Sequence, residues 1–442
     1  MQEISAMNKA PTASVITLGC KVNQYESEAI SEALEQNGIL PTDGVADVYI
    51  INTCTVTAES DRKSRQAIRR VLNKNPNAYI IVTGCSAQYD ANAVARISGV
   101  DAIIGNREKM QVVTVAKSLL EQGGKNDAPA IYTLPLDGAE FEKMRITKFD
   151  RTRAYIKIED GCESHCAYCT IPAVRGNIRS KAPEDVISEV KGLLSGGCAE
   201  VVLTGIETGS YGKDTKGISL VGLMEMIDGL DGGCRVRTGS LDPSVITEDF
   251  ARRVSVLASA APHYHLSLQS GCSKTLARMR RKYNADMALR ALERLRAHIP
   301  DVCFTTDVIV GFPGESEEDF LETMDFARRA RFLKIHVFPY SPRRGTEAAT
   351  MDGQIAEDIK RDRVHRLSSL EAEIRADILA EYLESHGCAE VLFETYRDGV
   401  AYGHTPSFIE VSAKSDRPLG GELHTVRLIS SDGEKIHGEI IE

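Results

Sequence analysis

The chain has 442 residues, of which 42% are hydrophobic and 26% are charged. This balance is ordinary for a globular protein, and the length predicts roughly two to four domains. The formal net charge of −10 argues against a protein that coats nucleic acid non-specifically, because such proteins are usually basic. No apolar run approaches the ~20 residues of a membrane helix, and the polar Met1–Pro11 segment does not resemble a secretory signal, so we expect a cytoplasmic protein.

The first part of the sequence, residues 12–122, alternates short apolar runs with amphipathic stretches. The helical patterns are Glu26–Glu35 and Glu59–Leu72. The strand-like runs are Val15–Leu18, Val48–Ile51, Tyr79–Val82 and Ala102–Ile104. This alternation predicts a small parallel α/β domain. A polar linker is expected over 123–150.

The α/β pattern continues in a second region, residues 151–384, which ends in one long charged helix. Its strand-like runs are Ala154–Ile158, Val201–Leu203, Val236–Thr238, His263–Leu268, Phe304–Val310 and Lys334–Phe338. Repeated β-α units of this length predict a full or partial β/α barrel. Residues 387–442 read instead as five short strands with polar turns, which predicts a small all-β barrel.

The 11 cysteines are an odd number in a long chain without a secretory signal, which favours metal or redox chemistry over a disulfide framework. Cys162, Cys166 and Cys169 have the spacing C-x3-C-x2-C and follow the predicted strand Ala154–Ile158. Iron–sulfur clusters are normally held by four cysteines, so three leave one iron open to a small ligand. The alternative is a zinc site with His165 as fourth ligand, although zinc usually takes two separated ligand pairs.

This motif, with Tyr168 before the third cysteine, resembles the signature of the radical S-adenosylmethionine (SAM) superfamily. The resemblance implies that Cys162, Cys166 and Cys169 hold a catalytic 4Fe–4S cluster whose open iron chelates SAM. Reduction would then cleave SAM to a 5′-deoxyadenosyl radical. We assign Tyr168 to cofactor binding.

A second set of cysteines is spread over the first domain. Cys20, Cys54 and Cys85 each come directly after a predicted strand. Because the carboxyl ends of parallel strands lie along one edge of a sheet, the three thiols are expected to meet there and to hold a second 4Fe–4S cluster. The alternative is that they are ordinary core residues.

The two cysteine sets together resemble the methylthiotransferase family of radical SAM enzymes. The match covers nearly the whole chain and includes, besides the cysteines, Thr17–Glu28, His265–Gly271, Arg278–Tyr283, Asp307–Glu315 and His336–Ser341. The Lys21-Val22-Asn23-Gln24-Tyr25 sequence is similar to the branch that acts on threonylcarbamoyl-adenosine in tRNA. The last β module is similar to the family's RNA-contacting TRAM domain.

The resemblance implies that the enzyme methylthiolates carbon 2 of N6-threonylcarbamoyladenosine beside the tRNA anticodon. One SAM would methylate sulfur at the amino-terminal cluster and a second would supply the radical, with both clusters facing one shared cavity. A flavodoxin or ferredoxin would donate electrons. The resemblance also places SAM contacts around Glu207. Ser267 and Gln269 alternate with Leu266 and Leu268, so both should face the barrel interior, where we assign them to SAM or substrate.

Basic residues gather in a few places despite the acidic total. We assign RNA contacts to Arg62, Arg65, Arg69, Arg343 and Arg344; a solvated surface is the alternative. The module from Gly387 has ten acidic residues against five basic ones, which suits RNA recognition by shape better than by charge.

Two other functions stay open. The substrate is alternatively isopentenyl-adenosine in tRNA or an aspartate of a ribosomal protein, as in other branches of the family. A zinc-stabilised RNA-binding protein without catalysis is the alternative from another class.

Overall fold

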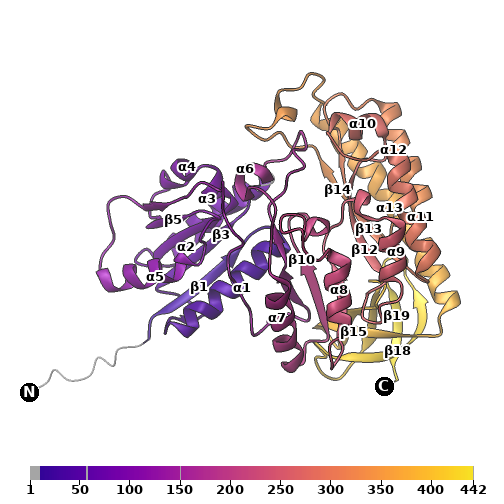
Figure 1. The fold of residues 1–442 in the computed structure, drawn as a ribbon, viewed down its shortest axis with the longest axis horizontal. Helices are drawn as coiled ribbons and strands as arrows, with labels where there is room; N and C mark the ends of the chain where they lie inside the picture. Colours follow the sequence, from indigo (N-terminus) through magenta and orange to yellow (C-terminus); the bar gives the residue numbers. More distant parts are fainter. Residues whose placement is uncertain (1–9, 56–57, 150, 442) are drawn as a thin grey trace, which may run out of the picture. The chain divides into compact units, whose positions relative to one another are not determined.

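The computed structural model describes residues 10–55, 58–149 and 151–441. The chain divides into two compact units, residues 1–147 with 170–177, and residues 148–169 with 178–442 (Figure 1). The chain therefore passes into the first unit directly after Cys169 and returns after eight residues. Among the described residues, no helix is both long and apolar enough to cross a membrane.

The first unit is built on a parallel six-stranded sheet with the order β2-β1-β3-β4-β5-β6. Its strands are β1 (Thr12–Thr17), β2 (Leu40–Pro41), β3 (Val48–Thr53), β4 (Tyr79–Gly84), β5 (Ala102–Ile104) and β6 (Ala130–Tyr132). Its helices are α1 (Lys21–Gln36), α2 (Ala58–Lys74), α3 (Cys85–Tyr89), α4 (Ala91–Ala95), α5 (Gln111–Gln122) and α6 (Ile171–Arg175). Strand β6 lies within residues 123–150, for which a linker was expected; three residues are too few to produce a clear strand pattern in the sequence.

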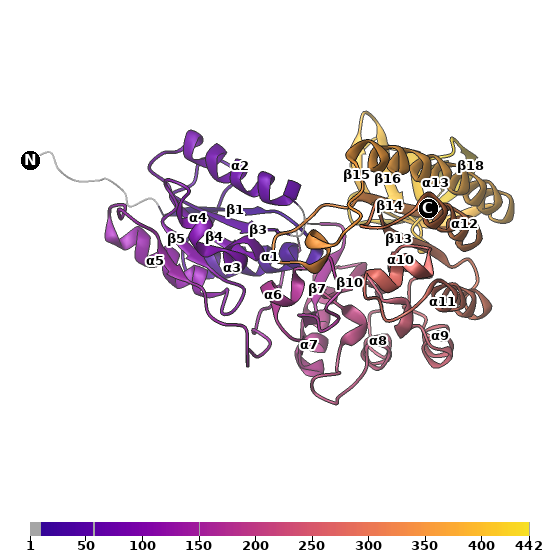
Figure 2. The ribbon, with the colours of Figure 1, turned by 90° about the horizontal axis from the view of Figure 1, so that it is seen from above.

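Helices cover both faces of this sheet (Figure 2). Ile30 and Leu34 of α1 pack with residues of α5 against one face. Ile68 and Val71 of α2 pack with α3 and α4 against the other. Because both faces are covered, the central strands are buried along their whole length, as Val48–Thr53 shows.

The second unit contains an incomplete β/α barrel made of two three-stranded parallel sheets, β11-β10-β7 and β12-β13-β14. Its strands are β7 (Ala154–Lys157), β10 (Glu200–Thr204), β11 (Arg235–Thr238), β12 (His263–Gln269), β13 (Cys303–Val310) and β14 (Lys334–Pro339), with a small hairpin of β8 (Glu159–Asp160) and β9 (Arg179–Ser180). The bridges Val236–Ala260 and Leu241–Leu266 link the two sheets.

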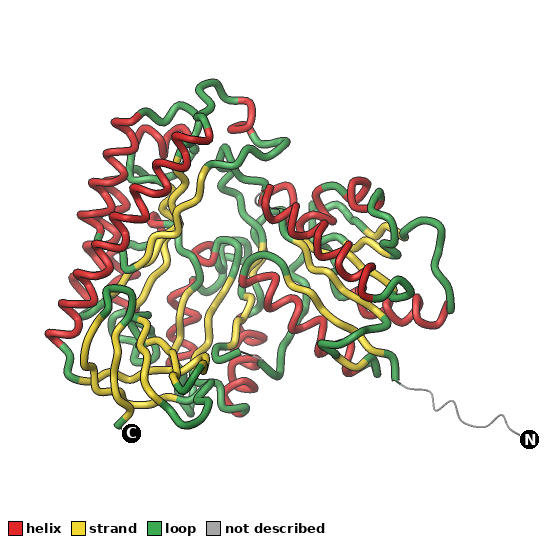
Figure 3. The backbone as a smooth tube through the Cα atoms, turned by 180° about the vertical axis from the view of Figure 1, so that it is seen from behind, coloured by secondary structure: helices red, strands yellow, loops and turns green. Residues whose placement is uncertain are grey.

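Helices line the outside of these sheets, and the last five strands of the chain form a separate small barrel (Figures 1 and 3). The helices are α7 (Pro183–Ser195), α8 (Leu220–Asp228), α9 (Glu248–Val254), α10 (Ser273–Arg278), α11 (Ala285–His298), α12 (Glu317–Ala330) and α13 (Glu357–Ser385), with the short 3-10 turns η1 (Thr208–Ser210), η2 (Pro243–Val245) and η3 (Glu347–Thr350). The closed barrel has the order β15-β16-β17-β19-β18 and comprises β15 (Cys388–Arg397), β16 (Val400–His404), β17 (Glu410–Lys414), β18 (Leu423–Ser431) and β19 (Ile436–Ile440). The predicted fold class, a parallel α/β domain, a partial β/α barrel and a small β barrel, is confirmed.

Candidate functional site

The cysteines of the second unit, Cys162, Cys166 and Cys169, form what we call the barrel trio. They sit on a tight loop that follows β7 and β8. The loop uses positive backbone φ angles at Gly161 (91°) and His165 (46°). It is closed by a hydrogen bond from the Cys169 amide to the Cys166 carbonyl oxygen (3.0 Å), and the Ala167 amide anchors it to the carbonyl of Met279 (3.0 Å). The loop therefore presents three thiols from nine residues of chain.

The barrel trio lies among charged groups. Arg281 Nη1 lies 3.2 Å from Cys166 Sγ, while Nη2 donates to Asp242 and to the Ser267 carbonyl oxygen. Only 7% of the Arg281 side chain is exposed. The guanidinium thus provides a buried positive charge where thiolates and a cluster would bring negative charge.

Two carboxylates, Glu207 and Glu159, also lie near the loop. Cys162 Sγ lies 3.7 Å from Glu207 Oε2. Burial is the largest cause of a raised pKa at Cys162; the Ser164 amide lowers it, and Glu207 raises it further. Burial and then Asp242 raise the pKa of Glu207, against Arg281. The Glu207 amide donates to Glu159 Oε2 (2.8 Å), and burial holds the pKa of Glu159 well above its ordinary value.

Other residues assigned to the cofactor lie nearby in the same unit. The Tyr168 ring packs edge-on against Phe312 at a centroid distance of 6.4 Å. Ser267 and Gln269 are half-buried on β12 and alternate with the buried Leu266 and Leu268, but the register of β12 against β13 shifts between Leu266 and Gln269. Gln269 also has a positive φ of 68°, which is unusual for this residue type. Their contacts with SAM stay predictions.

The cysteines of the first unit, Cys20, Cys54 and Cys85, form what we call the sheet trio. They follow β1, β3 and β4, which are neighbours in the sheet and pair in register through Thr17–Asn52 and Asn52–Thr83. A Cβ on Gly19 would lie 2.9 Å from Cys54 Cβ, so the first two loops touch, and only glycine fits there. The Ser86 hydroxyl donates to the Cys54 carbonyl oxygen (2.9 Å), which connects the second and third loops.

Two thiols of the sheet trio, Cys20 and Cys85, interact electrostatically. Cys54 and Cys85 are buried, whereas Cys20 is at the surface of the chain. The pKa of Cys20 is nevertheless raised: desolvation by neighbouring groups is the largest cause, Arg175 lowers it, and Cys85 raises it further. A bound cation or cluster would relieve this repulsion between thiolates.

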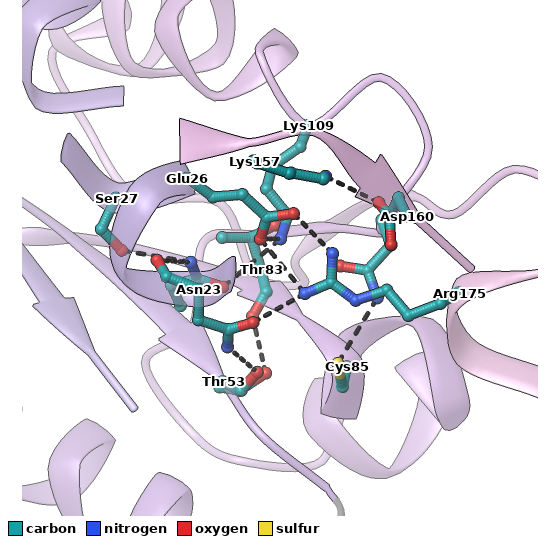
Figure 4. Close-up of polar contacts among 12 residues, drawn as sticks. Asn23, Glu26, Ser27, Thr53, Thr83, Cys85, Lys109, Lys157, Asp160 and Arg175 are labelled. Atoms are coloured by element: carbon teal, nitrogen blue, oxygen red, sulfur yellow. Dashed lines mark hydrogen bonds and ion pairs between the residues drawn. The ribbon is translucent and has the colours of Figure 1, made fainter. Parts of the chain in front are cut away.

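A buried polar network supports the sheet trio (Figure 4). Asn23 Nδ2 donates to the carbonyl oxygens of Leu18 (2.7 Å) and Thr53 (3.0 Å), the residues that lead into the first two cysteine loops. Arg175 Nη2 donates to Asn23 Oδ1 (2.6 Å), and Glu26 pairs with both Arg175 and Lys109. These ion pairs are almost fully buried, so they fix the loop geometry rather than respond to solvent.

The donor sets are compatible with clusters that are each held by three cysteines. A tetrahedral zinc ion draws its thiolate sulfurs to about 3.8 Å from one another, given its 2.3 Å Zn–S bonds. In the described part of the chain, neither trio has all three sulfurs within 4.8 Å of one another. A second cluster at the sheet trio stays a prediction.

The arginines assigned to RNA fall into two environments. Arg62, Arg65 and Arg69 are exposed on α2, the helix that follows the second loop of the sheet trio. Arg343 is 9% exposed, and Arg344 is exposed. RNA contact at all five stays a prediction, and the burial of Arg343 makes it the weakest of them.

Sequence reasoning missed several residues of the site. Arg281 is one of four basic residues within the five positions 278–282, a pattern that by itself indicates a solvated or RNA-facing surface. Arg175 and Asn23 lie about 150 positions apart, and no pattern in the sequence pairs them. His265, Asp307 and His336 were part of the family-like segments but had no assigned role, although their ligand atoms converge within 4.8 Å.

Comparison with known proteins identifies the family. Residues 156–327 match the radical SAM superfamily, and residues 12–105 match the uncharacterized protein family UPF0004. The threonylcarbamoyladenosine tRNA methylthiotransferases MtaB of Bacillus subtilis and Thermotoga maritima are each 36% identical, the first covering 97% of this chain and 96% of the relative, the second 96% of both. A tRNA-2-methylthio-N(6)-dimethylallyladenosine synthase of Aquifex aeolicus is 33% identical, over 96% of this chain and 98% of the relative.

Solved structures agree on the fold. The radical SAM methyltransferase TsrM from Kitasatospora setae, with cobalamin and a [4Fe-4S] cluster bound, has a TM-score of 0.54 at 14% identity and covers 77% of each chain. Membership of the radical SAM superfamily implies one 4Fe–4S cluster and SAM, for which the barrel trio is the matching motif. With relatives of this identity over nearly its whole length, the chain belongs to the methylthiotransferase family of radical SAM enzymes.

Proposed function

We propose that the protein methylthiolates carbon 2 of N6-threonylcarbamoyladenosine next to the anticodon of tRNA. The observation that carries this proposal is the combination of a barrel trio and a sheet trio in one chain that matches MtaB proteins along nearly its full length. Methylthiotransfer needs both a radical and a sulfur donor, and two separate cluster sites can supply the two.

The residues have distinct roles in this proposal. The barrel trio holds the cluster that binds SAM, and the sheet trio holds the second cluster. With its cluster and SAM bound, the barrel trio would supply a carbon-centred radical, and a cluster at the sheet trio would supply an activated sulfur. Arg281 balances the charge at Cys166, Glu207 and Gln269 position SAM, and the Asn23–Arg175 network keeps the three loops of the sheet trio together. A flavodoxin or ferredoxin provides the electrons, and the protein acts in the cytoplasm.

Nucleoside mass spectrometry tests the substrate. The full chain, reconstituted anaerobically with iron and sulfide, is incubated with SAM, dithionite and matched anticodon stem-loops that carry either threonylcarbamoyl-adenosine or dimethylallyl-adenosine. We expect methylthio product on the threonylcarbamoyl RNA. Product on the dimethylallyl RNA alone would move the protein to the branch of the Aquifex relative, and product on neither would reject a tRNA substrate of this kind.

Salt-dependent binding tests the RNA contact at α2. Lys and Arg contacts to phosphates make affinity fall steeply with salt. Replacing Arg65 and Arg69 by Glu should weaken tRNA binding and flatten its salt dependence. The matched control replaces Arg328 and Arg329 of α12, which are exposed in the other unit, by Glu; equal losses in both variants would indicate a non-specific charge effect.

A further inference from the structure

Three polar side chains meet on the second sheet of the incomplete barrel, and we call them the interior triad: His265 of β12, Asp307 of β13 and His336 of β14. His265 Nε2 lies 3.3 Å from Asp307 Oδ2. The two imidazole rings are 6.0 Å apart, and one ligand atom of each of the three residues lies within 4.8 Å of the others.

The triad faces the inside of the barrel. Tyr264 packs edge-on against Phe250 of α9, and the Arg296 guanidinium of α11 lies over Phe304, so these side chains face the outer helices. Side chains alternate along a strand, and His265 and Asp307 have the opposite parity. His336 is the register partner of Asp307 and shares its face. Beyond Leu266 the register of β12 against β13 shifts, and Gln269 pairs with Val308.

The triad is connected to the cluster loop through β12. Arg281 joins Cys166 Sγ to the Ser267 carbonyl oxygen, and His265 is two residues earlier on the same strand. Two strand residues span about 7 Å. A single nucleoside substituent is therefore long enough to reach from the cluster end of β12 to the triad.

The side chains of the triad have hydrogen-bonding capacity beyond the bonds that they make within the protein. Asp307 is 32% exposed, and among the described residues no Lys or Arg forms an ion pair with it; its partner is His265. The Thr305 hydroxyl lies within hydrogen-bond distance of both His263 Nε2 and His265 Nδ1 (3.0 and 2.9 Å), and it has one proton, so at least one of these imidazoles must donate. The His336 side chain is exposed, but desolvation by neighbouring groups lowers its pKa, which favours a neutral ring that can donate at one nitrogen and accept at the other.

The N6 substituents named in the relatives' substrates differ in polarity, which is the property that matters for binding at the interior triad. A threonylcarbamoyl group has a carboxylate, a hydroxyl and urea N–H groups, whereas a dimethylallyl group has no polar atom. An apolar chain buried against two imidazoles and a carboxylate would remove the hydrogen bonds that these groups make to water, and it would offer none in return. A polar substituent can satisfy them: Asp307 accepts from its hydroxyl or N–H, and the imidazoles donate to its carboxylate.

We propose that His265, Asp307 and His336 bind the polar N6 substituent of the substrate adenosine and select it over an apolar one. This inference rests on the proposed function and adds the residues that set its specificity. Sites that hydrogen-bond a substrate group can reject an analogue without it far more strongly than apolar pockets reject a surplus group.

A competition experiment tests the proposal. The full reconstituted chain receives equal amounts of the threonylcarbamoyl and dimethylallyl stem-loops, and mass spectrometry gives the ratio of the two methylthio products. In His336→Phe and Asp307→Asn we expect kcat/KM for the threonylcarbamoyl RNA to fall by roughly 10–100-fold, mainly through KM, with a corresponding fall in the product ratio. His336→Gln, which keeps a hydrogen-bond donor, should recover part of the loss.

The matched control is His365→Phe, which replaces an exposed histidine of α13 and should keep the wild-type ratio. Iron content and thermal midpoint identify any variant that fails to fold, in which case Asp307→Asn, the nearly isosteric change, decides. An unchanged ratio in both triad variants, while the wild type modifies threonylcarbamoyl RNA, would overturn this inference alone. A wild type inactive on that RNA would overturn the proposed function with it.

A cation at the triad is the rival outcome. Titration of the cluster-loaded protein with Mn²⁺, followed by electron paramagnetic resonance, should show no stoichiometric site. One Mn²⁺ per chain that is lost in Asp307→Asn would make the triad a metal site and overturn its role in substrate selection.

Discussion

The two cysteine trios reach similar donor sets by opposite routes. The barrel trio comes from one loop of nine residues, closed by local hydrogen bonds and two positive φ angles. The sheet trio comes from three loops, spread over 66 residue numbers, that meet because their strands are parallel neighbours. Local chain geometry fixes the first site, whereas the topology of a sheet and a buried ion network fix the second. The second site should therefore be more sensitive to changes in the fold.

The largest expected effect comes from removing the barrel trio. Replacing Cys162, Cys166 and Cys169 by Ala should reduce SAM cleavage by at least ~10³-fold, because no protein ligand would remain for the SAM-binding cluster. Measuring 5′-deoxyadenosine under reducing conditions checks this. Cleavage that persists at the wild-type rate would place the radical chemistry elsewhere in the chain.

Removing the sheet trio should separate two activities. In the Cys20, Cys54 and Cys85 to Ala variant, SAM cleavage should stay within a few-fold of wild type, while methylthio product falls by a similar ~10³-fold because the sulfur site is lost. The same chromatogram reports both products. Parallel loss of both activities in a protein that keeps its barrel cluster would contradict independent roles for the trios.

The buried network should make the sheet trio vulnerable to a change far away in sequence. Arg175→Ala removes one of the buried cations that pair with Glu26, and breaking such a pair costs ~3–5 kcal/mol, or roughly 10 °C in the thermal midpoint of the first unit. Differential scanning calorimetry measures the shift. Arg96→Ala, at an exposed position of the same unit, should move the midpoint by only about 1–2 °C. Equal shifts in the two variants would show that the buried network contributes no more to stability than an exposed arginine does.

A smaller effect is expected at Arg281. Its hydrogen bond to Cys166 stabilises the more negative, reduced form of a cluster. Arg281→Lys should lower the reduction potential of the barrel cluster by roughly 40–90 mV, which corresponds to ~1–2 kcal/mol in a one-electron couple. The potential of the second cluster, which we propose at the sheet trio, is the internal control. A redox titration in which both potentials move together would argue against a local contact.

The smallest predicted effect is a pH dependence at Glu207. Burial raises its pKa, so its carboxylate is protonated at a higher pH than an ordinary glutamate. If the carboxylate accepts a hydrogen bond from SAM, SAM affinity should fall by about 2–5-fold as the pH drops through that raised pKa. Glu207→Gln should remove this dependence, and Glu163→Gln, at an exposed position of the cysteine loop, should keep it. Equilibrium dialysis at several pH values compares the three proteins.

The difference between the trios also explains how much the sequence could predict. The motif at Cys162 is local, and the strand-end positions of Cys20, Cys54 and Cys85 can be read from the apolar runs that precede them. The fold class followed from the same runs. The pairing of Arg175 with Glu26 and the convergence of His265, Asp307 and His336 depend on tertiary contacts between distant segments, and periodicity contains no information about such contacts. The burial of Arg343 was hidden for the same reason, since a pair of arginines after a strand is usually exposed.

The iron content of the cysteine variants tests the central claim most directly. After anaerobic reconstitution we predict about eight irons per chain in the wild type and about four in each trio variant, with Mössbauer spectra of 4Fe–4S clusters in all three. About four irons in the wild type, unchanged when Cys20, Cys54 and Cys85 are replaced, would mean that the strand ends of the first unit hold no cluster, and the account of two cluster sites would be wrong.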